Sequence, residues 1–264
     1  MPTGKLDGVN SHSWRLKIRW ANKHIENLKA SLDAVESHPY PVTVKRDPKT
    51  RERVYYATKV PDISSEFALS AGDILHNLRS ALDHLACGLV RANGGTITNS
   101  TEFPIIEYAP RTDRDKARLA GKIEGIRQEA KDYILSIQPY RQGNAASALG
   151  RLHKLNIRDK HRLLLTFATA MTKFNIGQHW RATRVGTGQG YIPDHWVMSM
   201  VPLLEEGQKL LVDPPNAKVN ENPDVRLQIM VNEIGVCEGE PLIQVLKTSL
   251  YWVQGITADC ERFL

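Results

Sequence analysis

The sequence predicts a mainly helical α+β protein: a helical bundle core with an inserted β-hairpin and a small β-rich C-terminal appendage closed by a helix. Residues 1–171 carry apolar positions at three- and four-residue steps, which indicates amphipathic helices. From 172 onward, short apolar runs alternate with Gly and Pro, a pattern typical of strands and turns. We therefore expect a helical core over 1–171, with the hairpin at about 42–58. The segment 172–264 should supply the β-rich part and a helix that packs on the core, and both segments together also fit one single domain.

The first predicted elements are a helix and a hairpin. Apolar spacing indicates a helix over 14–36, which ends before Pro39 because a residue that precedes proline is driven out of the helical region. Two β-prone runs, 42–44 and 54–56, flank Asp47-Pro-Lys-Thr50. This arrangement predicts a two-stranded hairpin with a type I turn.

The next predicted helix, which includes 72–90, has an unusual polar face. Ser64 or Ser65 is its N-cap, and Asn93-Gly-Gly95 ends it. Its apolar stripe consists of Leu75, Leu78, Leu82, Leu85 and Leu89. Its polar face consists of Asp73, His76, Ser80, Asp83, His84 and Cys87. Because no Lys or Glu fills this face, as would be usual on a solvated helix, we expect its side chains to be packed in a cleft or interface.

The remaining elements are less regular. Residues 94–112 are predicted to form a loop, followed by a helix over about 121–138. Another helix is expected from about 145 towards 171, either continuous or broken near 157. The clearest strand-like run is 225–231, and a helix over 242–263 closes the chain.

The composition limits the class of protein. The 264 residues are 41% hydrophobic and 24% charged, as in ordinary globular proteins. The longest apolar run is far shorter than the roughly 20 residues needed to cross a bilayer, and the N-terminus lacks the apolar core of a signal peptide. Three well-separated cysteines fit a reduced cytoplasm better than a disulfide framework or a zinc site. We therefore expect a cytoplasmic protein with no membrane contact and no cofactor.

The positive charge is concentrated in the front part of the chain. Residues 1–162 contain 27 Lys and Arg against 18 Asp and Glu, whereas residues 163–264 contain 8 against 11. This asymmetry allows an anionic partner such as RNA for the front part, although many basic proteins bind no nucleic acid.

Arg79 and His84 are the candidate catalytic pair. Arginine binds phosphate oxygens through its fixed fork of donors, and histidine transfers protons near neutral pH. Together they suit metal-free cleavage of RNA through the ribose 2′-hydroxyl. They lie about 140° apart around a helix, so they can meet only where two helices or two protomers converge. Neither belongs to the leucine stripe, so replacing either should leave the fold intact. In the structural alternative, Arg79 forms an ion pair with Asp83 and His84 is an ordinary interface histidine.

A second concentration of polar residues is the segment 151–162, in which seven positions are Arg, Lys or His. On a continuous helix Asp159 falls inside the apolar stripe, and a buried carboxylate needs a cation or several donors. We expect it to lie within reach of Arg79, His76 or His84, where it either orients a catalytic histidine or closes a structural salt bridge. Three basic residues of this segment face elsewhere, as phosphate ligands or as a solvated surface: Arg158, His161 and Arg162.

The same two helices offer an alternative metal site, with His76, Asp83, His84, His153, Asp159 and His161 as ligands. No His-Glu-x-x-His or Glu-x-x-His pair is present, so we expect no metal.

The predicted hairpin is basic and aromatic. Its tip carries Lys45, Arg46, Lys49 and Arg51, and tyrosines lie nearby. Such a surface can stack on and neutralise single-stranded nucleic acid, yet hairpin tips are often charged and the tyrosines can equally face the core.

The run Arg79-Ser-Ala-Leu-Asp-His84 resembles the Arg-x(4–6)-His motif of the HEPN superfamily. Proteins of this superfamily are helical bundles, often dimeric, and many are metal-independent endoribonucleases of toxin–antitoxin and antiviral defence systems. The resemblance implies that Arg79 stabilises the phosphorane charge and His84 moves protons at a dimer cleft. Ser80 departs from the Asn, Asp or His that often follows the arginine. The hairpin and the β-rich part lie outside the superfamily's core.

Four further segments look like those of a family of uncharacterised bacterial proteins: 75–84, 102–105, 138–140 and 159–162. This second resemblance covers more of the chain and implies no activity.

Our leading hypothesis is a HEPN-like, metal-independent endoribonuclease or RNA-binding protein of a bacterial or phage conflict system. It would act as a homodimer, with an antitoxin or other protein as a further partner. Four residues would support the catalytic pair: His76, Asp83, Asp159 and His161. The alternatives are a non-catalytic helical interaction protein and a metal-dependent hydrolase on a helical bundle.

Overall fold

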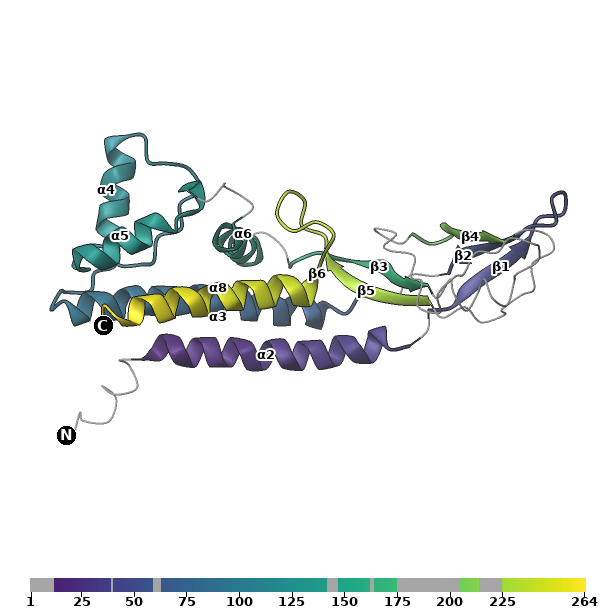
Figure 1. Cartoon of the computed structure of the whole chain (residues 1–264), viewed down its shortest axis with the longest axis horizontal. Coiled ribbons are helices and arrows are strands. Elements are labelled where there is room, and N and C mark those ends of the chain that lie inside the picture. Colours follow the sequence, from purple (N-terminus) through teal and green to yellow (C-terminus); the bar gives the residue numbers. More distant parts are fainter. Residues whose placement is uncertain are drawn as a thin grey trace, which may run out of the picture.

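The computed structural model describes residues 12–38, 40–58, 63–141, 147–161, 164–174, 205–213 and 225–264. Its helices gather at one end of an elongated molecule, and two small sheets extend toward the other end (Figure 1). The predicted mainly helical α+β class is confirmed.

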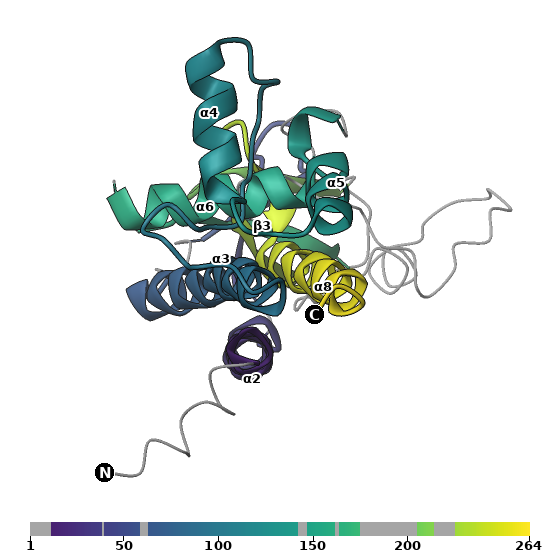
Figure 2. The same ribbon diagram turned by 90° about the vertical axis from the view of Figure 1, so that its left-hand side faces the viewer.

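Helix α3 (Ser65–Ala92) lies at the centre of the helical part. Helices α2 (Ser13–Glu36), α6 (Ala148–His161) and α8 (Leu242–Glu261) all contact it. Both ribbon views show α2 and α8 running beside α3 (Figures 1 and 2). The leucine stripe of α3 is buried as predicted, and residues outside the stripe are buried as well. A central helix of this kind has little free surface.

The boundaries and contacts of α2 and α3 follow from their sequences. The side chain of Ser64 caps α3 by accepting a hydrogen bond from the amide of Glu66 at 3.2 Å, as predicted. The buried face of α2 consists of Trp14, Ile18, Ala21, Ile25, Leu28 and Leu32. A Cβ at Gly88 would lie only 2.9 Å from Cζ3 of Trp14, so this glycine allows the ring to pack directly on the backbone of α3.

Two three-stranded antiparallel sheets complete the fold. The first has the order β1 (Val42–Arg46), β2 (Arg53–Ala57) and β4 (Lys209–Asp213). The second has the order β3 (Phe167–Phe174), β5 (Val225–Val231) and β6 (Glu240–Pro241).

The predicted hairpin is the pair β1–β2. In its turn the Asp47 carboxylate accepts the amides of Lys49 and Thr50, which lowers the pKa of Asp47. Asp47 thus holds the connection in a side-chain-stabilised turn.

The single helix predicted over 121–138 is wrong. The structure has α4 (Asp113–Lys122) and α5 (Gln128–Ser136), separated by Gly125 at a φ of +79°. Helix α4 buries no residue, so it has no apolar stripe that a search for periodicity could find.

The helix predicted from about 145 towards 171 is also too long. Helix α6 ends at His161, and the apolar run that follows leads into strand β3. A short apolar run does not distinguish a buried strand from a buried helix, and here pairing with β5 decides the outcome.

Among the described residues, no helix is both long and apolar enough to cross a bilayer. Cys87, Cys237 and Cys260 are free thiols. Much of the predicted β-rich segment, 175–204 and 214–224, lies outside the described residues.

Candidate active site and nucleic-acid interface

The guanidinium of Arg79 is enclosed by the fold, with 7% of the residue exposed. Its Nη1 contacts Oδ1 of Asp83 at 2.5 Å, and its Nη2 donates to the carbonyl oxygen of Phe103 at 2.9 Å. Oδ1 of Asp83 also accepts the amide of Phe103 at 3.0 Å. The Arg79–Asp83 ion pair is the one that the structural alternative anticipated, and the two side chains also clamp both backbone groups of Phe103 against α3.

A second clamp holds the same loop from the end of α5. The fully buried side chain of Gln138 donates from Nε2 to the carbonyl of Pro104 at 3.0 Å and accepts the amide of Ile106 at 2.8 Å. Its Nε2 also donates to the carbonyl of Ile134 at 2.9 Å. The loop segment 103–106 is thus tied to two helices by side chains that satisfy its backbone.

His84 faces a different element. Its Nδ1 lies 2.8 Å from Oγ of Ser13, at the start of α2, and burial together with nearby Lys17 lowers its pKa. Within one chain, therefore, the structure does not bring Arg79 and His84 together. The convergence implied by the motif would require a second copy.

The polar face of α3 is packed only in part. Ser80 and Asp83 are half-buried, but Asp73 and His76 are exposed in the chain, contrary to expectation. Burial and nearby Lys160 lower the pKa of His76. The outer end of this face is open because nothing described in the chain covers it.

Asp159 does not form the predicted salt bridge. Among the described residues it forms no ion pair with Arg79, His76 or His84, although His76 lies near enough for each group to affect the pKa of the other. Its carboxylate instead packs on the backbone of Gly72, where a Cβ would lie 2.4 Å from Oδ1. Burial and neighbouring Asp73 raise the pKa of Asp159. The predicted pairing is absent because Arg79 takes its partners from α3 and the loop.

The basic residues at the end of α6 lie in different environments. Arg158 donates to Oε2 of Glu233 at 2.6 Å and to the carbonyl of Ile234 at 2.9 Å, so it anchors a turn. His161 is the last residue of α6, and its side chain is not described. Arg162 lies outside the described residues.

The hairpin cations lie at the far end of the molecule from the bundle (Figure 1). Lys45 lies 5.4 Å from the ring centre of Tyr56, and Arg46 donates to the carbonyl of Arg51. Lys49 and Arg51 are exposed. This surface is separate from Arg79 and His84.

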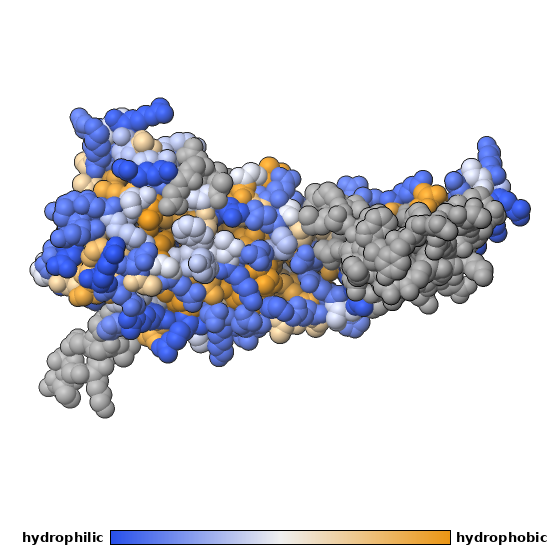
Figure 3. Space-filling view, viewed as in Figure 1, coloured by the Kyte–Doolittle hydropathy of each residue, from blue (hydrophilic) through white to orange (hydrophobic). Residues whose placement is uncertain are grey.

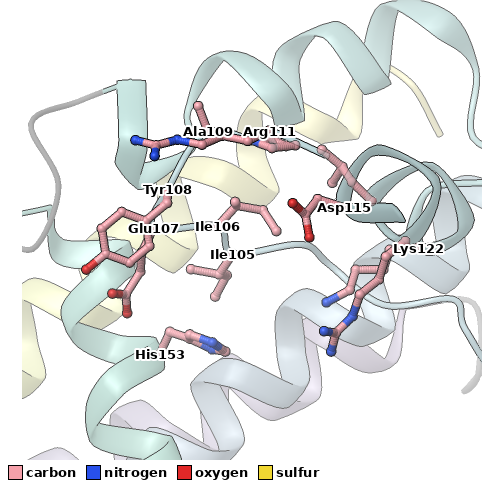
Figure 4. Close-up of a pocket in the computed structure, with 12 residues that line it drawn as sticks. Ile105, Ile106, Glu107, Tyr108, Ala109, Arg111, Asp115, Lys122 and His153 are labelled. Carbon is pink, nitrogen blue, oxygen red and sulfur yellow. The ribbon is translucent and has the colours of Figure 1, made fainter. Parts of the chain in front are cut away.

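A cleft of about 620 Å³ lies beside the clamped loop. Figure 4 shows His153 of α6 at the bottom of the view, with Tyr108 and Glu107 on one side and Lys122 of α4 on the other. The lining comes from the loop 105–111, from α4 and from α6. The face of α4 that lines it consists of Asp115, Arg118, Leu119 and Lys122.

The cleft combines cations with a neutral imidazole. Burial and the charge of Arg79 lower the pKa of His153 to about 4, and its buried Nδ1 has no hydrogen-bond partner. Lys122 pairs with Glu102, and Lys154 pairs with Glu107 at 3.2 Å.

Two further cations line the cleft without such a partner. Arg111 and Arg118 are exposed and form no ion pair within the described ranges. They are the cations that remain available to an anionic ligand.

The described residues contain no group of three or more His, Cys, Asp or Glu side chains that could hold a metal ion. His84 faces α2, whereas Asp159 lies against Gly72 and His153 lines the cleft. The alternative metal ligands are therefore distributed over several surfaces.

Comparison of the chain with protein-family models, with curated proteins and with solved structures gives no match. The resemblance to the HEPN superfamily thus rests on the motif at 79–84.

The cleft could not be found in the sequence because its walls come from three separate segments. One signal was present: Thr112 followed by Asp115 forms a capping box that begins α4. This capping box would have placed Arg118 and Lys122 on a helix.

We expect Arg79→Ala to lower the free energy of unfolding by about 2–3 kcal/mol, because Asp83 and the carbonyl of Phe103 are left without a charged donor. Urea unfolding measures this decrease. The matched variant Arg118→Ala removes an exposed arginine and should stay within about 0.5 kcal/mol of the wild type. An unchanged stability of Arg79→Ala would contradict the clamp.

We expect Asp159→Asn to stabilise the protein at pH 7. The pKa of Asp159 is higher in the folded than in the unfolded chain, so the charged form favours unfolding. Protonation of Asp159 removes this penalty. The stabilisation is therefore full below the unfolded pKa of about 3.9, and it is lost as the pH rises through the pKa of Asp159 in the folded chain. The advantage of the amide should therefore disappear at a pH of about 3.

Unfolding curves of wild type and variant at both pH values provide the measurement, with the exposed Asp132→Asn as control. A less stable Asp159→Asn at pH 7 would mean that the carboxylate has a favourable partner.

Proposed function

We propose that this chain is an RNA-binding protein and that single-stranded RNA binds in the cleft between α4, α6 and the loop 105–111. The observation that carries the proposal is that this cleft contains two arginines without an ion pair and a histidine nitrogen without a hydrogen bond. Arg111 and Arg118 form no ion pair in the described part of the chain, although the charge of Arg118 helps to lower the pKa of Glu102, and Nδ1 of His153 has no hydrogen-bond partner. The planar guanidinium group of arginine can donate to two phosphate oxygens at once. Positively charged grooves of this kind bind the backbone of single-stranded nucleic acids.

Tyr108 and His153 favour RNA as the ligand. Tyr108 is 72% exposed at the cleft, where its ring is free to stack on an unpaired base. A neutral imidazole can accept a hydrogen bond from a ribose 2′-hydroxyl, the group by which proteins distinguish RNA from DNA. The cleft is thus lined by cations, by an aromatic ring that can stack on a base and by a group that can bond to a ribose hydroxyl.

The same geometry also limits the role that Arg79 and His84 could have in RNA cleavage. Arg79 already donates to Asp83 and Phe103, and His84 faces α2, so within one chain this pair lacks a shared phosphate site. We therefore propose binding as the function of the cleft. A metal-independent nuclease, a cytoplasmic location and a role in a conflict system stay predictions of the sequence and of the resemblance.

Fluorescence anisotropy with a short labelled oligouridylate, in excess chelator, tests this proposal. We expect wild type to bind RNA more tightly than the matched deoxyoligonucleotide. Arg118→Ala should weaken binding and reduce the slope of log affinity against log salt by about 0.7 for each phosphate that the variant no longer neutralises. Lys116→Ala removes a cation of α4 that does not line the cleft and should change little.

Equal binding of RNA by wild type and Arg118→Ala would contradict the proposal. Chelator-resistant cleavage of the same RNA that His84→Ala abolishes would support the nuclease predicted from the motif.

A second candidate function is self-association through α2, because this helix exposes an apolar surface. Leu16 is 43% exposed and Trp20 is 52% exposed, and both line a groove of about 630 Å³ that His84 also lines. The motif histidine therefore lies where the resemblance would place a dimer contact. Lys17 and Lys23 line the same groove, so two copies would bring like charges together.

Sedimentation measurements over a range of concentrations test this homodimer. We expect Trp20→Ala to favour the monomer, and we expect salt to strengthen association of the wild type because it screens the lysines. The control Tyr251→Ala removes an aromatic residue that is 73% exposed on α8. A wild type that stays monomeric, or an equal effect of the control, would contradict this candidate.

A further inference from the structure

A second cavity, of about 260 Å³, lies where the helices meet the sheets. It is formed by the end of α2, the start of α3 and the β3–β5 pair. Its walls are mostly apolar, with Val35, Tyr40, Pro41, Ile63, Phe67, Leu227 and Ile229 as the apolar residues. Neither of the functions proposed above uses it.

The sheet side of this cavity presents an unpartnered hydroxyl. Thr169 of β3 is the cross-strand partner of Ile229, so their side chains share one face of the sheet with Leu227. Thr169 is only 5% exposed, and its Oγ1 has no hydrogen-bond partner. Buried hydroxyls normally have one, so this group can bond to a ligand in the cavity.

The helix side presents a carboxylate. Glu36 is the last residue of α2, and its Oε1 accepts the amide of Ile229 at 2.9 Å. Burial raises the pKa of Glu36, and the charge of nearby Lys29 offsets only part of this rise because Lys29 forms its ion pair with Asp33. A half-buried carboxylate with one backbone donor and no ion pair of its own among the described residues favours a cationic ligand.

The volume limits the size of that ligand. About 150 Å³ holds one benzene ring in an apolar cavity, and drug-sized ligands occupy pockets of about 300–1,000 Å³. The cavity therefore suits a single ring with a short chain.

We propose that this cavity binds a small apolar primary amine, of the arylalkylamine class. The ammonium group donates to the carboxylate of Glu36 and to Oγ1 of Thr169. The apolar body lies against Phe67, Ile63 and Leu227.

Isothermal titration of the full chain with 2-phenylethylamine tests this assignment. We expect saturable binding at one site. Glu36→Gln keeps an oxygen for the amide of Ile229 and removes the charge, so it should weaken binding about 10- to 100-fold. Thr169→Val conserves the shape of the side chain and should weaken binding about 3- to 10-fold. Thr43→Val, on the exposed strand β1, should leave the affinity unchanged.

The neutral analogue 2-phenylethanol separates charge recognition from simple filling of the cavity. We expect it to bind more weakly than the amine to wild type and with similar affinity to wild type and Glu36→Gln. The assignment is overturned if wild type gives no saturable binding, if the alcohol binds as tightly as the amine, or if Glu36→Gln binds the amine as wild type does. Arg118→Ala should not change amine binding, so this test is independent of the RNA cleft.

Discussion

A buried guanidinium needs fixed partners, and the fold of this chain satisfies that need at Arg79. Its donors bond to Asp83 on the next turn of α3 and to the carbonyl of Phe103, and Asp83 completes the clamp through the Phe103 amide. This anchored loop leads into one wall of the basic cleft, and the charge of Arg79 helps to keep His153 neutral. Core packing and the electrostatics of the cleft therefore depend on the same side chain.

Helix α3 also separates the candidate surfaces. Arg79 faces the clamped loop, whereas His84 contacts the start of α2 beside the groove of Leu16 and Trp20. The space-filling view shows hydrophobic residues between largely hydrophilic surfaces of the helical part (Figure 3). Because the two surfaces lie against different partners of one helix, the proposed RNA binding and the proposed self-association should respond to separate substitutions.

The sequence predicts those elements whose signals are local. The helices α2, α3 and α8, the leucine stripe of α3, the Ser64 cap and the β1–β2 hairpin are confirmed because each follows from spacing or turn chemistry. Helix α4 is solvated and has no stripe, and β3 is determined by pairing with the distant strand β5. The Arg79–Asp83 pair was predictable from its four-residue spacing. The cleft was not, because it needs the relative positions of 105–111, α4 and α6.

The double clamp of the loop has a consequence for how the cleft would discriminate among ligands. Phe103, Pro104 and Ile106 are held by Arg79, Asp83 and Gln138, so the loop is fixed where it enters the wall of the cleft, at Ile106. Beyond it, Tyr108 is 72% exposed and has no comparable side-chain anchor in the part of the chain that the structure describes. Conformational entropy would thus decrease on binding mainly at the rim. Such a division favours strict selection at the base of the cleft and tolerance of varied sequence at its mouth.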